Sequence, residues 1–166
     1  MFNLTPNQKS NTASEQAKNT FWQAISASPN LMIKLHNSDL HSEPMRVQFD
    51  QDARSKLWIY TTKNNRIASG GLAMAQFISK AHDVFACISG QLVEEKDPLI
   101  IDKYWSKEVE AWYPDGKLDS NLLMLRFELS DAEIWLVNNT TEAFDKFAVG
   151  ATVTSKEVGS HQKIKL

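Results

Sequence analysis

The feature that most constrains the fold is a series of short β-favouring segments separated by short polar turns. In 31–36 and 44–50, apolar residues alternate with polar ones, as in strands that bury one face. The apolar run 83–94 contains Gly90, and a glycine inside a strand marks a bulge or a close backbone approach. The predicted strands are 31–36, 44–50, 57–62, 72–79, 83–94, 122–129 and 133–138, the last two joined as a hairpin over 130–132.

Most successive strands of this set are close in the sequence, which favours antiparallel pairing. A small closed or partly closed barrel would protect the edges of such a sheet. A leading helix is predicted near 13–27, because a capping-box pattern at Thr12 and Glu15 precedes apolar residues at helical spacing. Shorter helical segments are predicted over 65–70, 97–106, up to 111, and 141–149. We therefore expect a mainly β fold with short helices.

The length of 166 residues fits one domain, which we place at 12–150, between a disordered arm (1–11) and a flexible tail (151–166). The net charge is only −2, and no basic stripe indicates nucleic acid. The first residues lack the apolar core of a signal peptide, and no stretch is long enough to span a bilayer. Cys87 is the only cysteine, which suits a reducing compartment. These observations predict a cytoplasmic protein with neither a membrane nor a nucleic acid as partner.

Several catalytic classes lack their characteristic residues. The four histidines are scattered, and no spacing typical of metal ligands occurs, so we predict no metal site. The chain has no nucleophile elbow, no phosphate-binding loop of the nucleotide triphosphatases and no dinucleotide fingerprint. The apolar surroundings of Cys87 argue against a nucleophilic thiol.

The run 57–66, Leu-Trp-Ile-Tyr-Thr-Thr-Lys-Asn-Asn-Arg, places hydroxyls, amides and two cations at the end of an apolar strand. Hydroxyl and backbone N–H donors beside Lys63 and Arg66 can bind a phosphate, and a helix starting near Asn65 would add its N-terminal field. A polar turn or helix-cap loop explains the same residues without a ligand. The residues alone leave both interpretations open.

Four segments, taken in order and spacing, carry a resemblance to a known family. They are Ser42-Glu43-Pro44-Met45, the run 57–62, Trp105 with Ala111-Trp112-Tyr113-Pro114-Asp115-Gly116, and Glu133-Ile134-Trp135. In these segments the chain resembles the general stress protein branch of the pyridoxamine-phosphate-oxidase-like flavoproteins over about 15–148. The resemblance implies a split β-barrel of antiparallel strands that forms a homodimer and binds FMN at the dimer interface. FAD and deazaflavins are the alternative cofactors, and NAD(P)H is a possible further partner.

The resemblance also implies a set of flavin-binding residues, which match the family by position. The stretch 42–45 matches a segment that runs beside the flavin, and 60–62 matches a strand end near the phosphate. Arg66 matches a phosphate-binding cation, and two tryptophans match aromatics that approach the other subunit's flavin. The implied residues are Ser42, Glu43, Pro44, Met45, Tyr60, Thr61, Thr62, Asn65, Arg66, Trp112 and Trp135. Packing across a dimer would also explain the tryptophans at 58, 105, 112 and 135.

Two departures from the family pattern affect the implied function. Glu43 stands where the family has Arg, and Asn64 stands where it has Ser. The first hypothesis is an FMN-binding homodimer, possibly a flavin-dependent oxidoreductase linked to stress. The alternatives are a non-enzymatic flavin-binding or sensing module, and a member that has lost its cofactor and acts as an interaction protein. Tyr60, Tyr113 and His41 are candidate proton-transfer groups, but the sequence assigns no catalytic residue.

Overall fold

The structure is a computed structural model that describes residues 6–50, 52, 54–138, 145–146, 148–152, 154 and 158–166, with the side chains of 6–11 left aside. Seven strands occur within this described part: β1 (Asn30–Leu35), β2 (Glu43–Arg46), β3 (Lys56–Thr62), β4 (Gly71–Ile78), β5 (Val84–Glu94), β6 (Leu122–Val137) and β7 (Gly159–Lys165). The helical elements are α1 (Pro6–Ala27), α2 (Pro98–Tyr104), α3 (Lys107–Glu110) and the 3₁₀ turn η1 (Gly116–Leu118).

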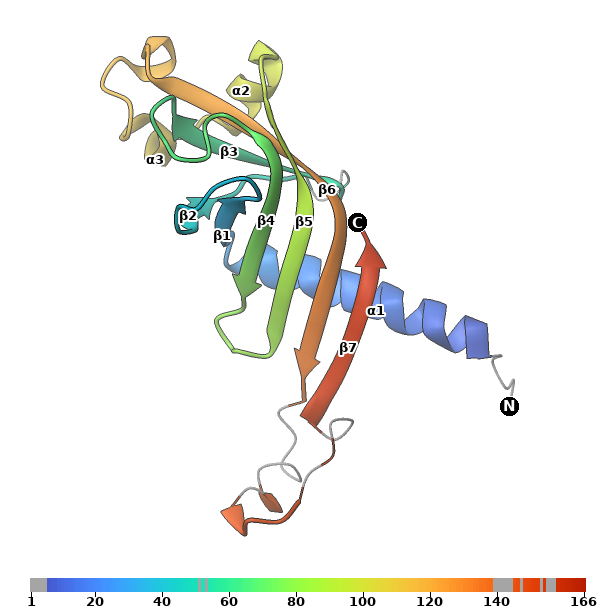
Figure 1. The fold of residues 1–166 in the computed structure, drawn as a ribbon. Helices are drawn as coiled ribbons and strands as arrows, with labels where there is room; N and C mark the ends of the chain where they lie inside the picture. The colour runs from blue at the N-terminus through green and yellow to red at the C-terminus, as the bar shows by residue number, and fades with distance from the viewer. Residues whose placement is uncertain are drawn as a thin grey trace. The chain divides into compact units, whose positions relative to one another are not determined.

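The strands form one sheet in the order β2-β1-β4-β5-β6-β3, and β7 pairs with β6 (Figure 1). The pairings of β1 with β2, β3 with β6 and β6 with β7 are antiparallel. The expected mainly β fold with a leading helix is therefore confirmed. Contacts cluster in two compact units, of which unit 1 comprises Met1–Ser28, Gln76–Cys87 and Asp131–Leu166, and unit 2 comprises Pro29–Ala75 and Ile88–Ser130. The single domain expected over 12–150 stays a prediction.

In unit 1, the apolar face of α1 forms part of the core. Ala17, Phe21 and Ile25 are fully buried, as the helical spacing predicts. The rings of Phe21 and Phe77 meet edge to face, with their centroids 5.8 Å apart. The helix begins at Pro6, so the expected disordered arm is wrong for residues 6–11. Proline is favoured in the first turn of a helix.

The chain end was predicted to be a flexible tail, but residues 159–165 form β7. The register places Ala132 opposite Ile164, and Ile164 is only 7 % exposed. A side chain on Gly159 would meet the Leu136 carbonyl oxygen at 2.1 Å, so this glycine permits the close approach of the two strands. The prediction failed because a polar segment with few apolar residues gains its stability from backbone pairing, which composition does not report.

The predicted hairpin over 130–132 is also wrong, because β6 runs without a turn from Leu122 to Val137. The buried positions nevertheless change phase at this point. They fall on odd numbers from Leu125 to Leu129 and on even numbers at Ala132 and Ile134. The break in alternation that suggested a turn is therefore a change of the buried face within one strand. The sequence there has no glycine or proline to reverse the chain.

Unit 2 contains most of the predicted strand faces. Leu31, Ile33 and Leu35 are buried on β1, and Leu57 and Ile59 are fully buried on β3. The close approach predicted at Gly90 is confirmed, since a Cβ there would lie 2.3 Å from the backbone oxygen of Glu128. The helix predicted after Asp97 is also confirmed, although α2 ends at Tyr104. The helix predicted over 141–149 falls largely outside the described residues.

Candidate functional site

The polar cluster at the end of β3 forms a compact turn. The backbone N–H of Asn65 donates to the Thr62 carbonyl oxygen at 3.0 Å, and Asn65 Oδ1 accepts from the Ile67 N–H at 3.0 Å. The segment 63–69 consists of turns, so the short helix expected at 65–70, and with it a helix N-terminal field, is not formed. Thr62 Oγ1 donates to Asn64 Oδ1 at 2.6 Å, and Lys63 Nζ donates to the Ser120 carbonyl oxygen at 2.5 Å.

Arg66 connects this turn to the segment that leads into β2. Its Nε forms an ion pair with Glu43 Oε2, and its Nη1 donates to the His41 carbonyl oxygen at 3.2 Å. The Arg66 side chain is 41 % exposed and that of Glu43 24 % exposed. We call residues 41–43 and 62–66 the rim. The structure therefore brings Glu43, Thr62, Asn65 and Arg66 together in unit 2.

The other predicted residues of 42–45 and 60–61 are placed differently. Met45 is 7 % exposed and lies opposite Leu31 in the β1–β2 register, so it contributes to the core. Thr61 is 7 % exposed, and its carbonyl oxygen accepts from Tyr113 Oη at 2.7 Å. Ser42 is half-buried and Pro44 is exposed beside the ion pair.

Tyr60 and Tyr113 belong to an aromatic cluster that packs against β3. The Tyr60 ring meets Trp105 edge to face at 5.6 Å, and Trp105 lies 5.8 Å from the Tyr113 ring. Tyr60 Oη donates to the Ile101 carbonyl oxygen at 2.5 Å, which ties α2 to the strand.

Both tyrosine hydroxyls are held in the protonated form. Burial, with a contribution from Asp102, raises the pKa of Tyr60 well above its usual range. Burial, with a contribution from Asp119, raises the pKa of Tyr113 to about 12. Because a general base must lose its proton near neutral pH, neither tyrosine suits that role.

The four tryptophans at 58, 105, 112 and 135 fall into two groups. Trp58 is 6 % exposed and packs at 5.1 Å on Tyr104, and Trp105 belongs to the cluster above. Trp112, which follows α3 in unit 2, is 82 % exposed. Trp135 lies on β6 in unit 1 and is 39 % exposed. Packing within unit 2 therefore explains two of the four, and it leaves Trp112 and Trp135 available at a surface.

In unit 1, β7 creates surroundings for Trp135 that the sequence did not reveal. The Trp135 and His161 rings stack with centroids 4.7 Å apart and planes 10° apart, and His161 Nε2 lies 3.5 Å from Glu133 Oε2. The two strands line a hollow of about 610 Å³ with residues that include Trp135, Val137 and His161. The sequence signal for β7 was weak, because Ile164 is the single buried residue of this strand.

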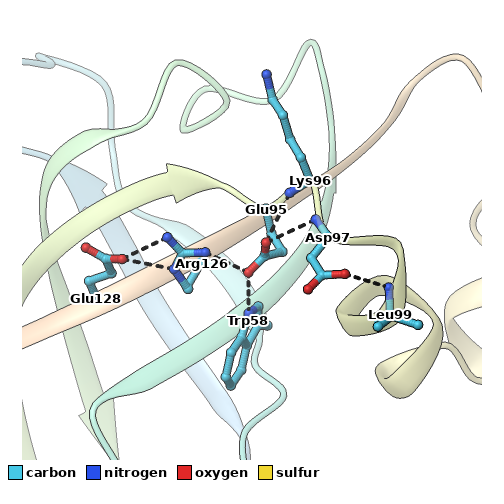
Figure 2. A network of polar contacts seen from close by, with 7 residues as sticks. All are labelled: Trp58, Glu95, Lys96, Asp97, Leu99, Arg126 and Glu128. Atoms are coloured by element: carbon cyan, nitrogen blue, oxygen red, sulfur yellow. Dashed lines mark hydrogen bonds and ion pairs between the residues drawn. The ribbon is translucent and has the colours of Figure 1, made fainter.

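A buried carboxylate in unit 2 was also missed. Glu95 is 8 % exposed, and its Oε2 accepts from Trp58 Nε1 at 3.0 Å and from Arg126 Nη1 at 2.8 Å (Figure 2). Its Oε1 accepts from the backbone N–H groups of Lys96 and Asp97, at 3.1 and 3.2 Å. Although burial by itself raises it, the hydrogen bonds from Trp58 and Arg126 bring the pKa of Glu95 below its usual range. Such complete pairing indicates a structural carboxylate.

Two further classes of site were sought in the described part of the chain. There, no three histidine, cysteine, aspartate or glutamate side chains gather as metal ligands would. Among the same residues, no helix has the length and apolar character needed to cross a bilayer.

Comparison with known proteins places this fold. No curated protein matches the chain. The general stress FMN/FAD binding protein from Xanthomonas citri shares 36 % sequence identity with a TM-score of 0.71, covering 76 % of this chain and 92 % of that one. A general stress family protein from Xanthomonas campestris pv. campestris shares 35 % identity with a TM-score of 0.69, covering 76 % and 90 %.

A more distant structure covers more of the chain. A general stress protein 26 from Jannaschia sp. CCS1 has a TM-score of 0.75 over 92 % of this chain and 99 % of its own, but at 19 % identity it supports the fold alone. The profile of the family described as pyridoxamine 5'-phosphate oxidase like matches residues 16–159. The chain therefore belongs to the pyridoxamine 5'-phosphate oxidase-like family, and its fold is the split β-barrel of that family's general stress proteins.

Proposed function

We propose that the chain binds FMN as a cytoplasmic homodimer and supports flavin-dependent redox chemistry in a stress response. The observation that carries this proposal is the rim, where Arg66 and Lys63 lie in one turn with hydroxyl and amide side chains at the end of β3. The protein that is 36 % identical over 76 % of this chain is described as FMN/FAD binding, which supports a flavin as the ligand.

The donor set of the rim fits a phosphate monoester. A dianionic phosphate favours cations and hydrogen-bond donors, and the guanidinium of Arg66 can bind it through two parallel N–H groups. Thr62, Asn65 and Lys63 lie in the same turn and would supply further donors. FMN is favoured over FAD because a terminal phosphate can use all of these donors at one place.

The exposure of Trp112 supports the homodimer. An indole that is 82 % exposed leaves a large apolar area in water, which folded proteins commonly cover at an interface. In the proposed dimer, Trp112 and Trp135 contact the flavin or its surroundings on the other subunit. The offset or edge-on contacts that aromatic rings prefer suit a planar tricyclic ligand.

The residues near the rim favour binding and orientation over proton transfer. Tyr60 and Tyr113 donate to backbone carbonyl oxygens and keep their protons, so they fix the shape of the site. A bound flavin would supply the electron-transfer chemistry, and NAD(P)H is the proposed electron donor.

A second candidate is a flavin-binding or sensing module without turnover. The ion pair between Glu43 and Arg66 favours such a module, because the Glu43 carboxylate already contacts the cation that would bind the phosphate. If this ion pair prevented phosphate binding altogether, the protein would have lost its cofactor. Reduction of bound flavin by NAD(P)H with transfer to an acceptor would identify an enzyme, whereas binding without such transfer would identify the module.

The test begins with the absorbance spectrum and solution mass of the purified protein. We expect FMN absorbance, or quenching of added FMN fluorescence, and a mass twice that of the chain. Arg66→Gln should weaken FMN binding about tenfold, since a charge-assisted contact contributes about 1.5–3 kcal/mol. Lys56→Gln, at the opposite end of β3, is the matched control and should change it less than twofold. A monomer that neither contains nor quenches FMN would refute the proposal.

A further inference from the structure

We infer that Glu43 determines how strongly the rim distinguishes phosphorylated from unphosphorylated flavins. This inference rests on the proposed function and concerns the ligand class that the same site accepts. The structure places a carboxylate of the protein on the cation that a ligand phosphate would use, so phosphate binding becomes a competition between two anions.

The contacts of Arg66 define this competition. Its Nε is engaged by the Glu43 carboxylate, and its Nη1 by the His41 carbonyl oxygen at 3.2 Å. Both side chains of the ion pair remain partly exposed, at 41 % and 24 %. A ligand can therefore reach the pair from solvent, but its phosphate must either displace the Glu43 carboxylate or bind beside it.

The neighbouring donors of the rim differ from Arg66 in the kind of acceptor that they contact. Lys63 Nζ donates to a backbone carbonyl oxygen, and Thr62 Oγ1 donates to a side-chain amide oxygen. These acceptors are neutral, so a dianionic phosphate would replace them with a gain in charge pairing. The acceptor at Arg66 is the Glu43 carboxylate, which is already ionised, so replacing it with a phosphate brings a smaller gain in charge pairing.

A phosphate that binds beside Glu43 would also be repelled by it. Two like charges about 4 Å apart at a partly exposed protein surface lower an affinity by about tenfold or more. The isoalloxazine ring and ribityl chain carry no such charge and do not experience this repulsion. We therefore expect Glu43 to reduce the preference of the protein for FMN over riboflavin by about tenfold.

The experiment measures the dissociation constants of FMN and riboflavin by fluorescence quenching in low-salt buffer near pH 7.5. Glu43→Gln removes the charge while its amide oxygen can still accept from Arg66 Nε. Glu128→Gln is the matched control, because Glu128 also pairs with an arginine and lies opposite Lys56, at the other end of the β3–β6 ladder. Six residues of strand, about 20 Å, separate that position from the rim.

Glu43→Gln should tighten FMN binding about tenfold and leave riboflavin binding within twofold, while Glu128→Gln changes neither. In the Arg66→Gln background, Glu43→Gln should give a smaller gain, because only the repulsion is relieved and the cation for which the two anions compete is absent. Binding of both flavins with an unchanged FMN-to-riboflavin ratio in Glu43→Gln would overturn this inference alone. A gain of the same size with and without Arg66 would overturn the competition. Failure of every variant to bind either flavin would overturn the proposed function with it.

Discussion

Replacing the buried carboxylate of Glu95 tests whether the network of Figure 2 stabilises unit 2 through charge. In Glu95→Gln the side chain keeps its shape, but its amide group can offer only one accepting oxygen. The new NH₂ group has two possible orientations. In one it faces the indole N–H of Trp58 and the guanidinium of Arg126, and in the other it faces the backbone N–H groups of Lys96 and Asp97. Two donors lose the carboxylate oxygen that accepts from them in either orientation.

The expected loss follows from these contacts. Hydrogen bonds to charged groups contribute about 1.5–3 kcal/mol, and removal of one partner from a buried ion pair costs about 3–5 kcal/mol. Arg126 keeps a second contact to Glu128 and is 25 % exposed, so the lower part of this range applies. We expect Glu95→Gln to lower the free energy of unfolding by about 2–3 kcal/mol at pH 7.5. Glu128→Gln, whose carboxylate is 43 % exposed, should cost less than about 1 kcal/mol.

The pH dependence gives the sign of the charge contribution. The hydrogen bonds lower the pKa of Glu95 in the folded state, so its stabilisation is fully present above the ordinary pKa of about 4.3. It declines below that pH and is lost as the pH falls through the lowered folded-state pKa. The difference between wild type and Glu95→Gln should therefore narrow in urea denaturation below about pH 4. A difference that stays constant down to low pH, or one below 0.5 kcal/mol at about pH 7.5, would refute the reasoning.

Two further perturbations test the close packing of unit 2. Gly90→Ala should lower the free energy of unfolding by about 3 kcal/mol, because its Cβ would lie 2.3 Å from the Glu128 backbone oxygen; a urea midpoint equal to that of wild type would contradict this contact. Tyr113→Phe should cost about 1 kcal/mol at pH 8 through one lost hydrogen bond. Burial raises the folded-state pKa of Tyr113 to about 12, so the stability difference between wild type and Tyr113→Phe should narrow as the pH rises from about 10 toward 12. A difference that does not narrow there would show that the hydroxyl is not held neutral.

The strands that the sequence predicts well are those whose burial follows a regular alternation. The pattern of Leu31, Ile33 and Leu35 predicts β1 because one face is buried throughout. Gly90 was also informative, because a glycine inside an apolar run indicates a close backbone approach. The sequence could not reveal β7, because its stability comes from backbone pairing with β6. A single buried residue, Ile164, is too weak a signal for a strand.

The candidate site was predictable in composition but not in pairing. The cations and hydroxyls of 61–66 were identified from their position after an apolar strand. The ion pair between Arg66 and Glu43 depends on the distance between a turn and the start of β2, which no local pattern reports. The role of Glu95 was missed for the same reason, since two of its four donors come from distant strands and the other two are backbone N–H groups.

The phase change inside β6 has a consequence for how this chain tolerates insertions and deletions. Its buried positions are odd from Leu125 to Leu129 and even at Ala132 and Ile134, so the residues between them form an offset of one position. Deleting Ser130 would bring Ala132 and Ile134 to odd positions and present the opposite face of one half of the strand. Length variation among natural relatives should therefore be rare at 130–131.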